Sequence, residues 1–372
     1  MKVCFWGEIA EALHGATPGG GELQIALLAK AFASSGDEVV LVDYITKTEF
    51  TTPEGIKVVP VPGWEKGIRI IRSFTHRFPW LYKTLRDQHA DVYYCRMRDF
   101  RHMITYRAAR KVKARFVYGL ADGYDTVSFI ERCKYDYFTK KKGLWWLINL
   151  IFSENIHPRL LRKADLVIAQ HEGQAESLRK KNVQAVVYHN LIELNHIPVV
   201  NNPERSAFIY VGSLAKNKGF DVFYELIVNN PNHFYKIIGQ PRDKTGAKYF
   251  RQLKDFSNVQ LYGRLNHASA INHINNSKAL ICTSPVEGFP NIFLEAWACG
   301  TPVLSLFVDP GNIIQNNNLG FFANGDIDKL YKAMLTIETS EVYSYNAKNY
   351  VLQNHILNEQ KIDEIRHLFH KA

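Results

Sequence analysis

Residues 287–303 of this chain read EGFPNIFLEAWACGTPV. The apolar run Ala279–Cys282 just before them is typical of a buried strand, and Pro290 suits the first turn of a helix, where a missing N–H costs nothing. Gly300 and Pro302 then favour the end of that helix. Strand, loop and helix in this order build parallel α/β sheets, which bind ligands at the carboxyl ends of their strands. We therefore expect a binding site in this loop, where the helix start presents N–H groups to an anion.

Two carboxylates frame this loop and helix. Glu287 lies in the loop, and Glu295 follows Asn291 by one helical turn, on the same helical face. A bound polyol could be held by both carboxylates while the N–H groups of Gly288 and Phe289 cradle it. Single glutamates at such positions are also common in helices without any function. The prediction of a binding site therefore rests on the complete run and not on either glutamate alone.

Short apolar runs alternate with amphipathic helical stretches along the whole chain, which predicts the α/β class with two Rossmann-like domains built on parallel sheets. A helix is expected at Glu22–Ala33, and the segment from Glu341 to the end is expected to be helical. The polar segment 195–205 separates two series of strands, so we expect domains at 1–197 and 198–372, with the final helix packing back on the first. The expected strands are Lys2–Trp6, Glu38–Val42, Ile56–Val59, Val92–Cys95, Arg115–Tyr118, Leu166–Ala169, Ala185–Tyr188, Ala207–Val211, Tyr235–Ile238, Val259–Leu261, Ala279–Cys282 and Val303–Leu306.

Composition excludes several classes of protein. The chain has 372 residues, of which 22% are charged and 46% hydrophobic, an ordinary globular balance. No run of 18 apolar residues predicts a membrane-spanning helix, and the first residues do not resemble a secretory signal. Five scattered cysteines without CxxC spacing indicate a reducing, cytoplasmic compartment, with neither a disulfide framework nor a zinc site.

The net charge of +10 is concentrated in one part of the sequence. Residues 66–115 contain 14 basic and 3 acidic side chains. Within residues 64–86, apolar side chains recur at three- and four-residue steps between arginines and lysines, and Pro79 is expected to divide the stretch into two short helices. Residues 140–152 combine three lysines with a following apolar run.

Both stretches are typical of interfacial helices on anionic lipid. The first is equally compatible with an apolar stripe that packs on the N-terminal sheet while its arginines are solvated. Nucleic acid is a further alternative partner, but we recognise no nucleic-acid-binding motif and expect no such partner.

The run from Glu287 to Val303 resembles the E-x7-E motif, E-G-F-x-N-x-x-L-E-A-x-A-x-G-x-P-V, of the family 4 retaining glycosyltransferases, which have the two-domain GT-B fold. Other stretches resemble further motifs of that family over most of the chain. They are Gly20–Glu22, Gly36 with Glu38–Val39, Ala164–Ile168, His189–Leu191, Val211–Leu214 with Lys218–Gly219, and Asn258–Arg264.

The resemblance implies an N-terminal acceptor domain and a C-terminal domain that binds a nucleotide-diphosphate sugar. Lys218 would pair with the diphosphate, Glu295 would bind the ribose hydroxyls, and Glu287 would hold the donor sugar and stabilise charge at its anomeric carbon. The implied donor-binding residues are Gly20, Gly21, Gly212, Lys218, Arg264, Gly288, Phe289, Asn291 and Glu295, and the implied catalytic residues are Glu287 and Asp122.

The sequence departs from the family pattern at two important positions. Ser213 stands where the family usually has arginine, so one contact to the diphosphate is lost or is supplied by Lys216 or Arg264. Near the end of the strand 115–118 the family often has a histidine that faces the sugar. Asp122 could take that position here, or it could cap a helix instead.

The function implied is that of a retaining glycosyltransferase that uses a UDP- or GDP-sugar and a lipid-linked glycan acceptor, in the cytoplasm or at the inner face of the plasma membrane. No metal or other cofactor is implied, because cationic side chains and helix dipoles can carry the leaving diphosphate. A sugar-nucleotide epimerase on the same fold and a basic membrane- or nucleic-acid-binding module are the alternatives. A nicotinamide dehydrogenase is disfavoured because no G-x-G-x-x-G follows the first strand.

Overall fold

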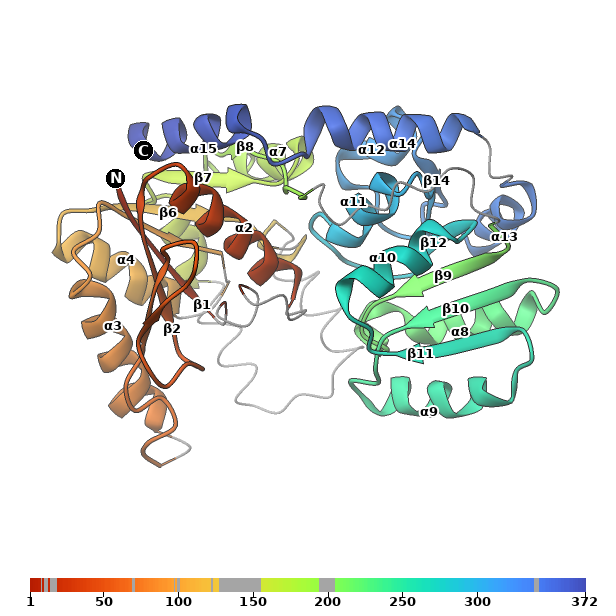
Figure 1. Ribbon diagram of the computed structural model, residues 1–372, viewed down its shortest axis with the longest axis horizontal. Coiled ribbons are helices and arrows are strands. Elements are labelled where there is room, and N and C mark those ends of the chain that lie inside the picture. Colours follow the sequence, from red (N-terminus) through yellow and green to blue (C-terminus); the bar gives the residue numbers. More distant parts are fainter. Residues whose placement is uncertain are drawn as a thin grey trace. The chain divides into compact units, whose positions relative to one another are not determined.

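A computed structural model (Figure 1) describes residues 1–7, 9, 13, 19–68, 71–96, 98, 101–121, 123–126, 155–193, 205–337 and 341–372. The chain forms two compact units. The first comprises Met1–Ala121, Asp125–Leu191 and Leu357–Ala372, and the second comprises Asp122–Tyr124 and Ile192–Ile356. The boundary expected between residues 197 and 198 lies outside the described residues.

The first unit is built on a sheet with strand order β3-β4-β2-β1-β5-β6-β7-β8, parallel throughout except for the β3–β4 pair. Its strands are β1 (Lys2–Gly7), β2 (Glu38–Asp43), β3 (Phe50–Thr51), β4 (Lys57–Pro60), β5 (Val92–Cys95), β6 (Arg115–Gly119), β7 (Leu166–Ala169) and β8 (Val186–Val187). Its helices include α2 (Gly20–Ser34), α3 (Phe78–Arg86), α4 (Arg101–Lys111), α7 (Glu172–Arg179) and α15 (Glu359–Lys371). Both faces of this sheet are buried: Cys4 and Trp6 pack with α3 and α4, and Val3 and Phe5 pack with α2 and α15.

The second unit is built on a parallel sheet with strand order β11-β10-β9-β12-β13-β14. Its strands are β9 (Ala207–Val211), β10 (Phe234–Ile238), β11 (Val259–Gly263), β12 (Ala279–Cys282), β13 (Val303–Ser305) and β14 (Gly320–Phe322). Its helices include α8 (Phe220–Asn229), α9 (Lys244–Gln252), α10 (His267–Asn275), α11 (Asn291–Ala298), α12 (Ile313–Asn316), α13 (Ile327–Thr336) and α14 (Glu341–Asn354). Ile209 faces α10, α11 and α14, whereas Phe208 and Tyr210 face α8 and α13.

The predicted class, α/β with two parallel-sheet domains, is confirmed. The predicted tail helix needs correction, because the tail forms two helices that belong to different units. The break between α14 and α15 ends at Asn358, whose side chain accepts a hydrogen bond from the N–H of Lys361 and starts a new helix. Apolar periodicity alone predicted one continuous helix, because it does not detect the N-cap residue that begins a second helix.

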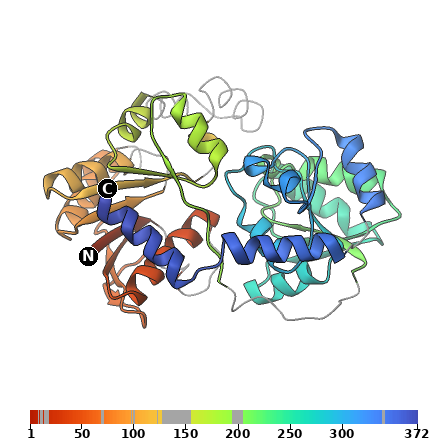
Figure 2. The same cartoon turned by 90° about the horizontal axis from the view of Figure 1, so that it is seen from above.

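The helix α15 belongs to the first unit (Figure 2), and a buried carboxylate fastens it there. Asp37, whose side chain is 1% exposed, binds the amino group of Met1 at 2.8 Å and Nε of Arg366 at 2.7 Å. Burial would raise the pKa of Asp37, but these two cationic partners hold it below its ordinary value. Phe369 on the same helix packs against Phe32 and Tyr94. The end of the chain therefore completes the core of the unit in which the chain begins.

The basic stretch 64–86 differs from the prediction in how its helices divide. A π-helical segment, Ser73–Arg77, continues directly into α3 at Phe78, and Pro79 lies in the first turn of α3, where proline is tolerated. Pro79 therefore does not separate two helices, which corrects the prediction.

Only part of the apolar stripe in this stretch is buried. Leu81 and Leu85 pack into the core. The side chains of Ile68, Ile71, Phe74 and Trp80, here called the apolar ridge, are between 37% and 69% exposed. The alternative in which the whole stripe packs on the sheet therefore holds for Leu81 and Leu85 and not for the ridge. The stretch 140–152 lies outside the described residues. No helix in the described part of the chain combines the length and apolar character that a membrane span needs.

Candidate active site

The candidate site lies within the second unit, where the neighbouring strands β9 and β12 end. The loop after β9 and the loop after β12 touch through their backbones. Gly219 has φ of 66°, and a Cβ built there would lie 2.0 Å from the carbonyl oxygen of Thr283. The Thr283 hydroxyl donates a hydrogen bond to the Gly219 carbonyl at 2.9 Å. Only glycine permits both this left-handed φ and this close approach.

The approach of the two loops places Lys218 against Glu287. The Lys218 Nζ lies 2.5 Å from Glu287 Oε1, and the Ser284 hydroxyl donates to the same oxygen at 2.7 Å. The Lys218 and Glu287 side chains are 36% and 20% exposed, so the pair is partly shielded and still reachable by a ligand. Burial, and next the charge of Glu287, raise the pKa of Cys282 to about 12, which keeps that thiol protonated.

The second carboxylate, Glu295, is paired as well. On α11 its Oε1 lies 3.2 Å from Nε2 of His267, the first residue of α10. The hydrogen bond to Glu295 raises the pKa of His267 above its ordinary value, although burial acts in the opposite direction. His267 is not among the site residues predicted from the sequence. The available signal was Asn266, which caps α10 and accepts from the N–H of Ser269.

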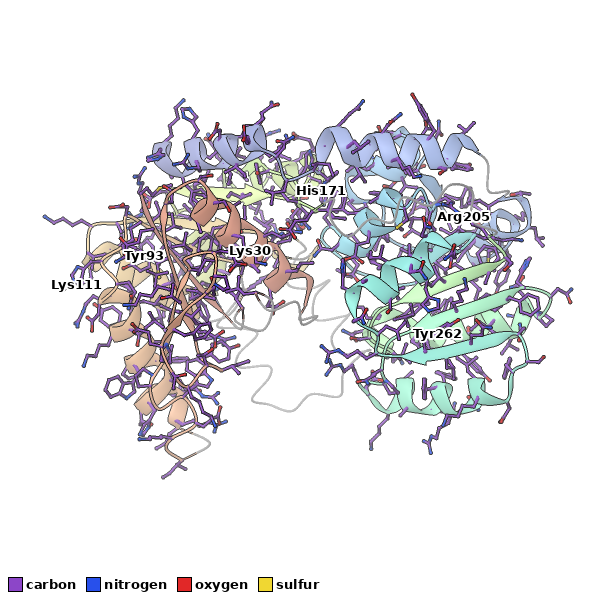
Figure 3. The ribbon with its side chains drawn as sticks, viewed as in Figure 1. Lys30, Tyr93, Lys111, His171, Arg205 and Tyr262 are labelled. Carbon is purple, nitrogen blue, oxygen red and sulfur yellow. The ribbon has the colours of Figure 1, made fainter. Side chains whose placement is uncertain are left out.

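The far end of α11 is held by a residue that sequence reasoning did not single out. Arg205 (Figure 3) donates to the carbonyl oxygens of Gly300 and Cys299, which follow α11, at 2.5 and 2.9 Å. A cation at a helix C-terminus satisfies free carbonyl groups and complements the helix dipole. Arg205 thereby fixes the helix that carries Glu295.

The other predicted residues of this loop and helix have distinct placements. Gly288 is buried, and the buried Phe289 side chain packs against Trp297 and His355 as part of the core. Pro290 is the N-cap of α11 and lies just before its first turn, so Asn291 is the first helical residue. The packing of Phe289 gives its side chain a structural task, which leaves its backbone as the part that could bind a ligand.

Gly212 and Arg264 lie at the same edge of the second sheet. Gly212 directly follows β9. Arg264 is exposed and directly follows β11, which is two places from β9 in the sheet. The structure thus brings Lys218, on the loop after β9, next to Glu287, on the loop after β12. Arg264 follows a more distant strand.

The remaining predicted residues belong to other parts of the chain. Gly20 and Gly21 form the first turn of α2 in the first unit, and Gly19 is the N-cap. They therefore begin the helix that was expected to start at Glu22, and they offer helix N–H groups in place of a loop. Asp122 lies outside the described residues.

Comparison with known families decides what kind of protein has this arrangement. Residues 193–354 match the family model of glycosyl transferases group 1, and residues 19–190 match the model of the glycosyl transferase 4-like domain. Together the two models cover most of the chain, which belongs to the glycosyltransferases that combine these two domains. The predicted family resemblance is thereby confirmed.

Curated relatives of this glycosyltransferase are distant. It is 25% identical over 223 residues to an uncharacterized glycosyltransferase of Haemophilus influenzae, a match that covers 55% of this chain and 62% of that protein. It is 30% identical over 162 residues to the lipopolysaccharide 1,6-galactosyltransferase of Salmonella typhimurium, which covers 40% of this chain and 45% of the relative. The matches thus span less than two thirds of either relative's length.

Solved structures share the fold over the whole chain. Sucrose-phosphate synthase from Thermosynechococcus elongatus superposes with a TM-score of 0.79 at 14% identity, covering 100% of this glycosyltransferase and 98% of that chain. The Anabaena protein HepE in complex with UDP gives a TM-score of 0.70 at 14% identity, covering 100% of both chains. At this level of identity, the likeness shows a common GT-B fold.

The close contact at Gly219 yields a first prediction. The variant Gly219→Ala should destabilise the second unit by about 1–3 kcal/mol more than Gly263→Ala, because an added methyl group would collide with the Thr283 carbonyl. Gly263 is a matched control, since it has the same φ of 66° and nothing within 4 Å of an added Cβ. Thermal unfolding of both variants measures the difference. Equal losses would show that the two loops can separate without cost.

The pair of His267 and Glu295 yields a second prediction. In Glu295→Gln the pKa of His267 should fall, because burial remains and the charged partner that raises it most is gone. Since the folded pKa is raised, the pair stabilises the fold fully below pH 6.5 and loses that contribution as the pH rises through the folded value. Titration of the histidine ring signals by NMR checks both statements. The exposed Glu225→Gln is the control, and an unchanged His267 titration in Glu295→Gln would contradict the assignment.

Proposed function

We propose that this glycosyltransferase retains the anomeric configuration of its donor, a nucleotide-diphosphate sugar, and transfers the sugar to a hydroxyl of a lipid-linked glycan. The observation that carries the proposal is the second unit's pair of carboxylates. Each has a cationic or protonatable partner, and the two lie on the loop and the helix that follow one strand. HepE, which has the same fold, was solved in complex with UDP, which supports a nucleotide as the leaving part of the donor.

The proposed donor contacts follow from the chemistry of these groups. Glu295 accepts hydrogen bonds, as the two adjacent hydroxyls of a ribose would require, and His267 holds its carboxylate in place. Lys218 offers a mobile ammonium for the diphosphate. Glu287 offers a carboxylate oxygen to the hydroxyls of the donor sugar, and its hydrogen bonds from Lys218 and Ser284 keep it oriented.

The proposed reaction breaks the bond between the anomeric carbon and the diphosphate oxygen. The bonding electrons leave with the diphosphate, whose added charge Lys218 and the N-terminus of α8 stabilise. Positive charge then develops at the anomeric carbon, and the carboxylate of Glu287 stabilises it. The acceptor hydroxyl attacks from the face that the diphosphate leaves, and its proton passes to the departing phosphate. This scheme assigns no step to a metal ion.

The acceptor is proposed from the first unit's surface and from one relative. The relative of Salmonella typhimurium is named for lipopolysaccharide, a lipid-linked glycan, which supports a role in the biosynthesis of a cell-surface polysaccharide. The apolar ridge of Ile68, Ile71, Phe74 and Trp80 supports attachment to the lipid surface that carries such an acceptor.

The charges around the apolar ridge favour an anionic membrane. Arg72 and Arg77 share one acidic partner, Glu65, at 2.6 and 2.7 Å. Lys66 and Lys83 add two further cations to the same stretch. Cations therefore outnumber Glu65, which suits a surface of anionic lipid. The described cysteines are all free thiols, which supports the reducing, cytoplasmic face of the membrane as the place of action.

Replacement of Glu287 tests the proposed chemistry. Glu287→Gln should lower the rate of sugar transfer at least about a hundredfold, since it removes the charge that stabilises the anomeric carbon. The fold should persist, because Gln has the same shape and the residue is partly exposed. Mass spectrometry of products, from a panel of UDP- and GDP-sugars with lipid-linked acceptors, measures transfer. Glu225→Gln is the matched control, and transfer at the control rate in Glu287→Gln would contradict the assignment. A product that forms without any acceptor would instead indicate an epimerase.

The ridge gives a separate prediction. The double variant Ile71→Ser, Phe74→Ser should bind vesicles of phosphatidylglycerol and phosphatidylcholine at least about tenfold more weakly than the wild type, because it removes the apolar surface that inserts. Sedimentation with vesicles measures binding. Leu335→Ser with Val342→Ser is the control, since those side chains are 70% and 63% exposed on the second unit. Equal binding by both double variants would exclude the ridge as the contact.

A further inference from the structure

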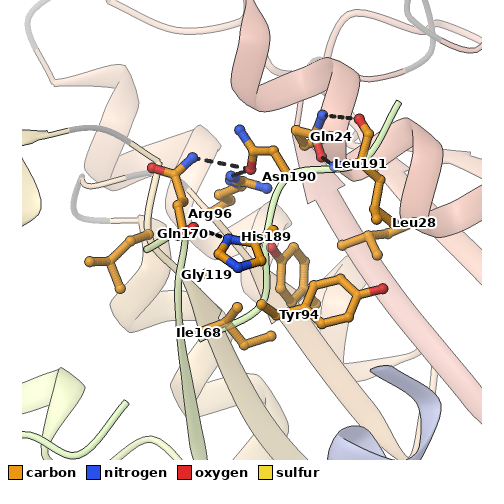
Figure 4. A pocket seen from close by; sticks show the side chains of 12 residues that line it. Gln24, Leu28, Tyr94, Arg96, Gly119, Ile168, Gln170, His189, Asn190 and Leu191 are labelled. Atoms are coloured by element: carbon orange, nitrogen blue, oxygen red, sulfur yellow. Dashed lines mark hydrogen bonds between the residues drawn. The ribbon is translucent and has the colours of Figure 1, made fainter. Parts of the chain in front are cut away.

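A small pocket in the first unit surrounds a buried arginine (Figure 4). Arg96 directly follows β5, Gly119 ends β6, and Gln170 directly follows β7. All three residues line the pocket, and all three lie at the carboxyl edge of the sheet, where open α/β sheets bind their ligands. The pocket is thus placed where a substrate group of the first unit would be held, although no family motif pointed to Arg96.

Arg96 is buried and has no ionic partner among the described residues. Its side chain is only 6% exposed, and within the described part of the chain no carboxylate pairs with it. One Nη donates to Asn190 Oδ1 at 2.6 Å, while the buried Nε has no hydrogen-bond partner. Burial of a charge without a counter-ion and of an N–H group without an acceptor both cost free energy. A ligand that brings negative charge and an acceptor oxygen would remove both costs.

The neighbours of Arg96 are neutral and hold it in place. Asn190 Oδ1 also accepts from Gln170 Nε2 at 3.2 Å, and Gln174 exchanges two further hydrogen bonds with Gln170. The half-buried His189, which also lines the pocket, places Nδ1 3.0 Å from the Gln170 carbonyl oxygen and therefore donates to it. Burial lowers the pKa of His189 and lowers that of His171 (Figure 3) to about 4, so both rings are neutral near pH 7. The guanidinium of Arg96 is therefore the positive charge that this network presents to the pocket.

The size of the pocket suits one oxygen atom of a larger group. Its volume is about 10 Å³, close to what a single water molecule occupies. Leu28, Leu120 and Ile168 form apolar parts of the wall, which strengthens the attraction of Arg96 for an anion because the local dielectric constant is low. An oxyanion can insert one oxygen next to Arg96 while the rest of its molecule remains outside.

We propose that this pocket binds an oxyanion of the acceptor, a phosphate or a carboxylate group, through the guanidinium of Arg96. The inference rests on the proposed function, in which the first unit takes the acceptor. It narrows that acceptor to glycans or glycolipids with an acidic group near the hydroxyl that receives the sugar. Arg96 is then a residue that determines specificity and acts apart from the carboxylates of the second unit.

The arginine Nε–Hε signals of the ¹⁵N-labelled wild-type protein report directly on this pocket. The signal of Arg96, assigned by its absence in Arg96→Lys, should shift saturably when inorganic phosphate or sodium acetate is added at constant ionic strength. The signal of the exposed Arg107, assigned with Arg107→Lys, should not shift and serves as the control. A response to phosphate alone identifies a phosphorylated acceptor, and a response to acetate alone identifies a carboxylate.

An Arg96 signal that stays unchanged up to tens of millimolar of both anions would overturn the proposal and leave a water site. If Arg96→Lys does not fold, wild-type crystals soaked in selenate decide instead. An anomalous peak beside Arg96 Nε supports the site, and its absence overturns it. Turnover of nucleotide sugars by the wild type is measured in parallel. If the Arg96 signal shifts with an anion but no nucleotide sugar is turned over, the proposed function alone is rejected. If nucleotide sugars are turned over but the Arg96 signal does not shift, the oxyanion site alone is rejected.

Discussion

The candidate site depends on one backbone contact, that between Gly219 and Thr283. The residues are 64 positions apart in sequence, yet the Thr283 hydroxyl donates to the Gly219 carbonyl at 2.9 Å, and a Cβ at Gly219 would lie 2.0 Å from the Thr283 carbonyl. Lys218 directly precedes Gly219, and Glu287 lies in the loop that continues from Thr283. This contact therefore decides whether the ammonium group of Lys218 and the carboxylate of Glu287 meet. The ion pair is a consequence of how two adjacent parallel strands end.

The two units differ in whether their charged side chains have ionic partners. In the second unit, Glu287 and Glu295 each have a partner within hydrogen-bond reach, so the charges are nearly balanced before any ligand binds. In the first unit, Asp37 is balanced by Met1 and Arg366 at the amino edge of the sheet, whereas Arg96 at the carboxyl edge has only neutral partners among the residues that the structure describes. A buried charge without a counter-ion costs free energy. Its presence at a ligand-binding edge is therefore stronger evidence of function than a buried charge that is balanced by partners.

Sequence periodicity predicted the strands well, because buried parallel strands are short apolar runs with clear ends. Val92–Cys95, Leu166–Ala169, Ala207–Val211 and Ala279–Cys282 have the predicted bounds. Two short strands, β3 and β14, were missed, because two or three residues show no period. The division of the tail and the continuity across Pro79 were also missed, since both depend on where helix caps and packing place the ends of helices.

The sequence by itself determined the fold class, the family and the run that contains both carboxylates, because these depend on local patterns of apolar residues, glycines and prolines. Only the tertiary structure decided the partners. His267 lies 28 residues before Glu295, Arg205 lies 94 before Cys299, and Asn190 lies 94 after Arg96. None of these pairs has a signal in local spacing, because each joins segments that are distant in the chain and come together only in the folded unit. The physical reason is that parallel sheets gather loops that are distant in the chain, and burial then fixes which polar groups must satisfy one another.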